Sequence, residues 1–295
     1  MGKFEIVRGK QTNAVKTVVY GVEGIGKSTL ASCFPNPLFI DIEGSTGQLD
    51  VARFPAPQSW AEVLEMTSAA RGACDTLVLD SIDWAERLAA ASICARQRVK
   101  ALDELSYGRG FSLLATEFER LLAALDGTGL HVVLVGHARV KKIELPDDAG
   151  AYDRWTLALS RTTEPLVKQW ADLMLFCNYR TSLCERDGKR RATGQERVMF
   201  STHTATHDAK CRFNLPDEMS LQFEGIAPIF AAPPVFCADC GAELLPYRDS
   251  AGREVSVERH VARSRAKFGK VCCLDCINAA RAGDTVAGTE DADGR

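Results

Sequence analysis

Short apolar runs alternate with amphipathic segments along the first two thirds of the chain. The apolar runs are short enough to be buried strands. They lie at residues 16–20, 38–42, 76–80, 130–135 and 171–179. The segments between them have the residue patterns of helices, which are expected over 27–34, 59–70, 84–98 and 111–125. Strands that alternate with helices in this way predict a three-layer α/β domain with a mostly parallel sheet.

Other segments break this periodicity. Residues 100–110 and 139–163 are expected to be loops, and loops as long as the second are usually functional or mobile. Asp187-Gly188 predicts a hairpin turn, and 197–203 would be its return strand.

A change in composition divides the chain after its α/β part. We expect a core at residues 1–230 and a small cysteine-containing module at 231–280, which begins with a proline-rich linker. Residues 281–295 are small, polar and acidic, and are expected to form a disordered tail.

Composition limits where the protein acts and what it binds. The 295 residues carry a net charge of −3, so any surface that binds nucleic acid must be local. No apolar run approaches the roughly 20 residues needed to cross a bilayer, so we expect a cytoplasmic protein without a membrane partner. In that compartment the 11 cysteines are expected to be thiols or metal ligands.

The glycine-rich stretch after the first strand carries the strongest chemical signal. Gly21, Gly26, Lys27 and Ser28 fit the phosphate-binding pattern G-x-x-x-x-G-K-[ST] between a strand and a helix. Glycines let backbone N–H groups converge on phosphate oxygens, while the lysine reaches the β/γ-phosphates and the serine binds Mg²⁺. The residues expected to bind nucleotide are Gly21, Val22, Glu23, Gly24, Ile25, Gly26, Lys27, Ser28, Thr29 and Asp80.

Carboxylates and a histidine follow other strands at the same predicted edge of the sheet. Asp80 would support Mg²⁺ opposite Ser28, and Asp83 is the better N-cap for the helix that follows. Asp41 and Glu43 end the second strand, and we choose Glu43 as the base that activates water; the alternative is that both are solvated turn residues. His137 would contact the γ-phosphate, with a simple core or surface role as the alternative.

The order of these parts resembles the RecA-like recombinase core. The strings FIDIEGS (39–45), TLVLDSID (76–83) and HVVLVGHARVKK (131–142) follow the phosphate-binding loop in that family's order. AKCRFNLPDEM (209–219) is similar to a late element of RecA-like ATP-binding proteins of bacteriophages, including single-strand annealing recombinases. The resemblance covers about residues 17–221 and implies a RecA-like P-loop NTPase core that uses ATP and Mg²⁺.

The resemblance also implies roles for single residues. Glu43 would be the catalytic base, and His137 takes the position of the nucleotide sensor, which is commonly glutamine in RecA itself. Lys210 and Arg212 would act on the γ-phosphate of a neighbouring subunit, in a ring or filament with ATP at the subunit interfaces. The alternative for these two cations is simple solvent exposure.

In the same family the loops at 100–110 and 139–163 would bind single-stranded DNA. Residues 139–164 carry as many acidic as basic side chains, whereas a groove that follows a nucleic-acid backbone needs cations and stacking aromatic residues. The alternative for Trp155 is packing on the core or on a neighbouring subunit. The candidate DNA contacts are two clusters: Arg139, Lys141 and Lys142, and Tyr152, Arg154 and Trp155.

The leading hypothesis is a RecA-like ATPase that single-stranded DNA stimulates. It would promote annealing or strand exchange in phage recombination in the bacterial host cytosol, with a single-strand DNA-binding protein as a further candidate partner. Two alternatives stay open. One is a small-molecule phosphotransferase with 139–163 as its lid, and the other is a regulatory ATP switch that loads a replication protein through the C-terminal module.

Two C-x-x-C pairs mark a second chemical centre near the C-terminus. Four thiolates complete a closed tetrahedral Zn²⁺ site, which predicts a zinc-ribbon-like module. The expected ligands are Cys237, Cys240, Cys273 and Cys276. Cys272 could replace Cys273, and His260 could replace one cysteine; redox-active or unpaired thiols are the alternative.

A basic segment lies between the two cysteine pairs. Arg259, Arg263 and Lys267 recur every four residues and would share one face of a helix. We predict that this face binds single-stranded DNA, with an ordinary solvated helix face as the alternative.

Overall fold

The computed structural model describes residues 14–144, 150–180, 182–186, 189–193, 196–231, 235–249 and 252–286. The predicted turn at 187–188 therefore lies outside the described residues. The chain divides between Ala231 and Ala232 into two compact units, which are described separately below.

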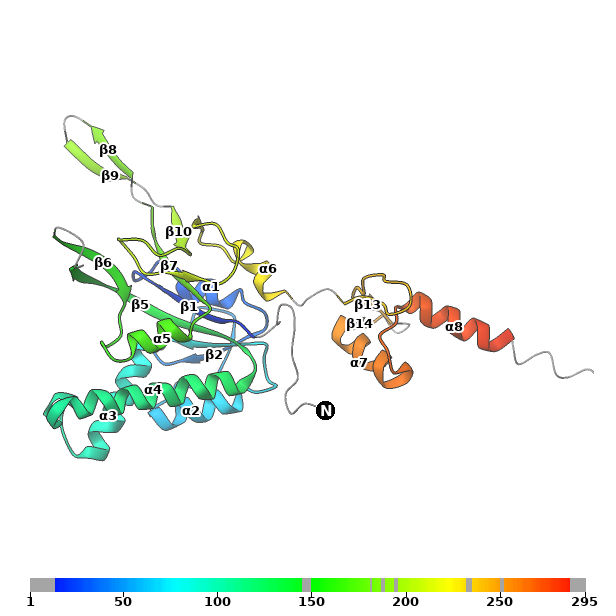
Figure 1. Ribbon diagram of the computed structural model, residues 1–295, viewed down its shortest axis with the longest axis horizontal. Coiled ribbons are helices and arrows are strands. Elements are labelled where there is room, and N and C mark those ends of the chain that lie inside the picture. Colours follow the sequence, from blue (N-terminus) through cyan, green and yellow to red (C-terminus); the bar gives the residue numbers. More distant parts are fainter. Residues whose placement is uncertain are drawn as a thin grey trace, which may run out of the picture. The chain divides into compact units, whose positions relative to one another are not determined.

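A ten-stranded sheet forms the centre of the first unit (Figure 1). Its main path runs in the order β12-β10-β7-β1-β5-β4-β2-β3. These strands are β1 (Lys16–Gly21), β2 (Pro37–Asp41), β3 (Ala52–Arg53), β4 (Thr76–Asp80), β5 (His131–Glu144), β7 (Leu173–Tyr179), β10 (Arg197–Phe200) and β12 (Glu218–Ser220). The six strands from β7 to β3 pair in parallel, whereas β10 and β12 pair antiparallel. The mostly parallel α/β fold predicted from the sequence is confirmed.

Helices cover the sheet and close two apolar cores. The helices of this unit are α1 (Lys27–Ser32), α2 (Trp60–Ala69), α3 (Ile82–Gln97), α4 (Arg109–Thr128), α5 (Glu164–Trp170) and α6 (Ala227–Phe230). Helices α2, α3 and α4 lie together on one side of the sheet (Figure 1), where Phe118 and Leu121 of α4 are buried. In the second core, Leu30 of α1 packs with Phe34 and with Phe230 of α6. The sheet is therefore held between two apolar layers, as alternation of strands and helices requires.

Residues 139–163 are not the long loop that their mixed charge predicts. Strand β5 continues to Glu144, and β6 (Ala151–Leu157) pairs with it antiparallel. A bond from the Trp155 backbone N–H to the Thr206 carbonyl fixes β6 to the core. A two-stranded hairpin with solvated faces has the same polar composition as a loop, so composition could not distinguish them.

The segment at 100–110 is partly ordered into short turns. It contains the 3₁₀ turns η1 (Leu102–Glu104) and η2 (Ser106–Gly108), and α4 starts at Arg109. Tyr107 is fully exposed and has a positive φ of 57°.

Smaller elements complete the first unit. Strand β11 (Lys210–Cys211) pairs with the start of β7, and β8 (Ser182–Arg186) pairs with β9 (Lys189–Thr193). The turn η3 (Phe223–Gly225) precedes α6.

The second unit holds a short hairpin and two helices. Strand β13 (Tyr247–Arg248) pairs with β14 (Glu254–Val255), and they are followed by α7 (Val257–Phe268) and α8 (Leu274–Val286). Helix α8 includes residues 281–286, and the rest of the expected tail lies outside the described residues. Among all helices that the structure describes, none is both long and apolar enough to span a membrane.

Candidate nucleotide-binding site and metal centre

The turn between β1 and α1 requires glycine at specific points. A Cβ on Gly21 would lie 2.1 Å from the carbonyl oxygen of Cys177 on β7, so no side chain fits there. Gly24 and Gly26 have φ values of 69° and 110°, which L side chains rarely adopt. The turn can therefore present its backbone N–H groups to an anion, at the start of α1.

Lys27 and Ser28 place an ammonium and a hydroxyl group at the end of this turn. The Lys27 ammonium donates hydrogen bonds to the carbonyls of Gly21 (3.2 Å) and Val22 (3.0 Å). Burial lowers its pKa. Ser28 Oγ donates to Asp80 Oδ2 at 2.5 Å. Asp80 ends β4 with only 1% of its surface exposed, and this burial raises its pKa to about 6.

These groups line one cavity of about 410 Å³. The cavity is lined by Glu23, Gly24, Gly26, Lys27, Ser28, Thr29, Glu43, Ser45, Asp80 and His137. It has a lysine and backbone amides for phosphate, and a hydroxyl beside a carboxylate for Mg²⁺. The donor set thus fits a nucleoside triphosphate with its metal. Ile25 is fully buried in the core and so anchors the turn.

Asp41 and Glu43 play different parts at the end of β2. The Asp41 carboxylate accepts hydrogen bonds from the backbone N–H groups of Gly44, Ser45 and Thr46, so it stabilises the turn after β2. The side chain of Glu43 is 28% exposed and lines the cavity. The geometry therefore leaves Glu43 as the carboxylate of this pair that can reach water beside a phosphate.

His137 reaches the cavity from β5, the strand between β1 and β4. Its Nε2 lies 3.9 Å from Glu43 Oε2, and its Nδ1 lies 3.0 Å from Asp83 Oδ2. The hydrogen bond with Asp83 raises the pKa of His137. Burial alone would raise the pKa of Asp83, but the hydrogen bonds from His137 and the charge of its ring act against burial, and the pKa is lowered overall.

The expected N-cap role of Asp83 is wrong. Ser81 occupies the N-cap position of α3, and Asp83 lies in the first turn with its carboxylate on His137. Local sequence suits both residues to a helix start, but only the fold brings His137, which is more than 50 residues away, to this carboxylate.

Arg197 is a site residue that the sequence analysis missed. Its Nη1 lies 3.3 Å from the point where a Cβ on Gly26 would be. It lines a second cavity, of about 320 Å³, which shares Gly26 and Thr29 with the first. The remaining lining residues are Leu30, Cys33, Leu221, Gln222, Phe223 and Glu224. A lining of both apolar and polar residues next to a phosphate site fits the nucleoside part of a nucleotide.

Lys210 and Arg212 do not join this site within one chain. Strand β11 pairs with Met174 and Leu173 at the start of β7, whereas Gly21 pairs with Cys177 further along that strand. The Lys210 ammonium donates to the carbonyls of Lys168 and Gln169. Arg212 forms an ion pair with Asp172 at 2.8 Å.

The expected DNA-binding clusters on β5 and β6 are partly engaged inside the first unit. Arg139 pairs with Glu164 at 3.0 Å, and Arg154 lies 3.7 Å from Asp208. Trp155 packs on Phe176 with ring centroids 6.0 Å apart, so it contributes to the core. Lys141 and Lys142 are exposed. A cavity of about 490 Å³ nearby is lined by Phe111, Arg139, Val140, Lys141, Ser160 and Arg161.

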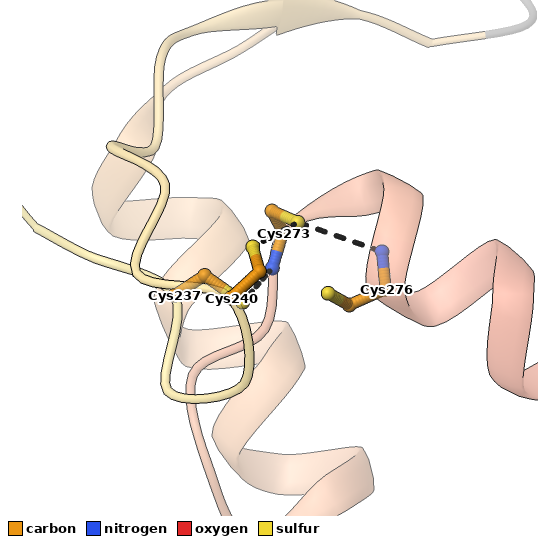
Figure 2. Close-up of side chains that lie close together, drawn as sticks. All are labelled: Cys237, Cys240, Cys273 and Cys276. Atoms are coloured by element: carbon orange, nitrogen blue, oxygen red, sulfur yellow. Dashed lines mark hydrogen bonds between the residues drawn. The ribbon is translucent and has the colours of Figure 1, made fainter.

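The two C-x-x-C pairs meet in the second unit (Figure 2). The sulfur atoms of Cys237, Cys240, Cys273 and Cys276 all lie within 4.8 Å of one another. Zn–S bonds of about 2.3 Å in a tetrahedron place sulfur atoms about 3.8 Å apart, so the cluster fits Zn²⁺. The Sγ atoms of Cys240 and Cys273 are 3.6 Å apart.

The alternative zinc ligands are engaged elsewhere. Cys272 is buried with its thiol on Asp239 Oδ2 (3.3 Å), and His260 Nε2 lies 2.7 Å from the Cys272 carbonyl oxygen. Cys237 is prepared for a metal, because hydrogen bonds from the backbone N–H groups of Cys240 and Cys273 lower its pKa to about 6.

Helix α7 places its basic residues on the outside of this unit. Val257, His260, Val261 and Ser264 face inward, at helical spacing. The expected helix is confirmed, and Arg259, Arg263 and Lys267 are exposed along one face of it, whereas Arg265 is exposed on another side. The outward cations Arg259, Arg263, Arg265 and Lys267 have no acidic partner among the side chains that the structure describes.

Comparison with known proteins gives one family match. A protein family described as an AAA domain matches residues 13–213. Among solved structures, a KaiC-like protein from the hyperthermophilic archaeon Pyrococcus horikoshii OT3 is similar, with 15% sequence identity and a TM-score of 0.36. That likeness covers 64% of this chain and 78% of the other. No curated protein matches.

Proposed function

Since the chain belongs to the AAA-domain family, we propose that it hydrolyses ATP at the loop between β1 and α1. One observation carries the proposal: Lys27, the Ser28–Asp80 pair and Glu43 line one cavity, at the carboxyl ends of β1, β4 and β2. Phosphoryl transfer needs charge neutralisation, a metal site and an oriented nucleophile, and these residues supply one group for each.

Each side chain has a distinct task in this reaction. Lys27 and the backbone N–H groups of the loop bind the β- and γ-phosphates. Ser28 and Asp80 would hold Mg²⁺, which supplies Lewis-acid stabilisation of the phosphate charge when bound. Glu43 orients a water and accepts its proton, and His137 lies beside it in the same cavity, with Nε2 3.9 Å from Glu43 Oε2.

Product analysis separates this proposal from phosphotransfer to a small molecule. With Mg²⁺ and γ-labelled ATP, the label is expected in inorganic phosphate at the same rate whether or not nucleosides or sugars are present. Label that moves to an added acceptor would contradict hydrolysis as the function. The proposed lid of a phosphotransferase coincides with the β5–β6 hairpin, so the structure offers it no support.

We further propose that the ATPase acts on single-stranded DNA as a homo-oligomer, in annealing or strand exchange. Lys210 and Arg212 would then approach the phosphates of a neighbouring subunit. The face of α7 that carries Arg259, Arg263 and Lys267 supports DNA binding, because these three cations are exposed and lack acidic partners among the described side chains. A regulatory ATP switch that loads a replication protein is the competing proposal, and it requires little DNA binding by the protein itself.

Reversal of charge on α7 tests the DNA-binding proposal. Arg259→Glu, Arg263→Glu and Lys267→Glu together should weaken binding to single-stranded DNA, because each cation releases a counterion from a phosphate. The slope of log K against log salt should fall by about 2, at about 0.7 for each contact. Fluorescence anisotropy of labelled oligonucleotides at several salt concentrations measures both effects.

A matched control removes the effect of net charge. Arg53→Glu, Arg71→Glu and Arg98→Glu change three exposed arginines of the first unit and the same total charge. This control should keep the wild-type salt slope. Equal loss of binding in both triple variants, or no loss in zinc-loaded protein with the α7 changes, would refute DNA binding by α7.

A further inference from the structure

Asp83 makes contacts that a residue in the first turn of a helix does not need for the helix itself. Its side chain is 8% exposed and faces β5, where one oxygen accepts the backbone N–H of His137 at 3.2 Å. Its two oxygens also lie 3.2 and 3.0 Å from Nδ1 of the same histidine. One carboxylate thus holds both the backbone and the ring of His137.

His137 lies at the point where β5 stops pairing with β1 and starts pairing with β6. His137 is the last residue of β5 that pairs with β1, opposite Gly21, and the next residue, Ala138, pairs with Leu157 of β6. The backbone of Gly136, the preceding residue, lies close to the side chain of Leu157, since a Cβ on Gly136 would be 2.6 Å from a methyl carbon of Leu157. The backbone contact from Asp83 therefore fixes His137 at the point where the strand leaves the parallel sheet.

The ring contact determines which nitrogen faces the cavity. A carboxylate beside Nδ1 favours a proton on that nitrogen, as with other histidines oriented by a carboxylate. The opposite nitrogen, Nε2, then points towards Glu43, 3.9 Å away. Rotation of the ring would break the contacts of Asp83 with Nδ1.

We propose that Asp83 is a positioning residue, which holds His137 so that Nε2 faces Glu43 and the phosphates in the cavity. This inference rests on the proposed ATPase function. Asp83 does not line the cavity itself, so it acts through His137. A role only in starting α3 would affect folding stability but not the protonated nitrogen of His137.

Asp83→Asn tests the proposal, because the amide is nearly isosteric but carries no charge to favour a proton on Nδ1. We expect kcat for ATP hydrolysis to fall about tenfold or more, with KM for ATP within about twofold of the wild type. Nitrogen-15 NMR should show wild-type His137 protonated on Nδ1, and Asp83→Asn should shift the proton partly to Nε2. The His137→Gln spectrum assigns the signals.

Glu86→Gln is the matched control on the same helix. The Glu86 carboxylate accepts from the Ser160 backbone N–H rather than from His137, so its loss should leave the His137 signals unchanged. Unchanged kcat and signals in Asp83→Asn would overturn the proposal. A wild-type spectrum with the proton only on Nε2 would overturn it without any variant. The NMR result does not need ATPase activity, so failure of the proposed function is seen separately as absence of phosphate release by the wild type.

Discussion

Glu43→Gln should lower kcat for ATP hydrolysis by about 100-fold or more and leave the affinity for Mg·ATP close to that of the wild type. Glutamine keeps the size of the side chain but cannot accept a proton from water, and general-base catalysis contributes about 10² to 10⁴ in rate. Lys27, Ser28 and Asp80, which hold the triphosphate and its metal in this account, are untouched. Phosphate release under saturating ATP and calorimetric titration with a non-hydrolysable analogue measure the two effects.

Glu65→Gln is the control, since Glu65 is an exposed carboxylate on α2 that does not line the cavity. It should hydrolyse ATP at close to the wild-type rate. A rate within threefold of the wild type for Glu43→Gln, or an equal loss for Glu65→Gln, would contradict the assignment of Glu43 as the base that activates the water.

Removal of zinc should unfold the second unit and leave the first one able to bind ATP. The apolar cluster that holds α7 is small, with Cys237, Leu244 and Cys272 as its buried members, so it cannot stabilise the unit alone. Structural zinc contributes about 10 to 16 kcal/mol of binding free energy in finger peptides, more than a core of this size supplies. We expect one zinc per chain by atomic spectroscopy and loss of helical circular dichroism after chelation.

Cysteine variants make this prediction specific. Cys273→Ser should lose the zinc, whereas Cys272→Ser should retain one equivalent because its thiol lies on Asp239, outside the cluster. The reverse pattern would overturn the ligand assignment. Retention of α7 and α8 after complete removal of zinc would show that the metal is not structural.

Much of the first unit could be predicted because its information is local. A buried strand such as β4 appears as a short apolar run, and a phosphate-binding loop has glycines at fixed spacing. Parallel strands end at a common edge, which is why Glu43, Asp80 and His137 could be placed together before the fold was known. The cysteine cluster could be predicted in the same way, because the C-x-x-C spacing of the two cysteine pairs is typical of zinc ligands.

The residues that were missed depend on contacts between distant segments. Arg197 reaches Gly26 only because β10 pairs antiparallel with β7. The residues of β10 alone do not determine the register of that pairing. Asp83 lies in a segment whose sequence is typical of a helix start, whereas its contact with His137 joins α3 to β5. The β5–β6 hairpin was hidden because solvated strands and loops share a polar composition.

The central claim is that the loop at Gly21–Ser28 binds ATP for hydrolysis, and phosphate release by the full chain tests it most directly. The wild type should release phosphate in a reaction that depends on Mg²⁺ and saturates with ATP. In Lys27→Ala, confirmed as folded by circular dichroism, the release should be lost together with ATP binding. Phosphate release by Lys27→Ala at the wild-type rate, or none by zinc-loaded wild type with or without single-stranded DNA, would contradict the account.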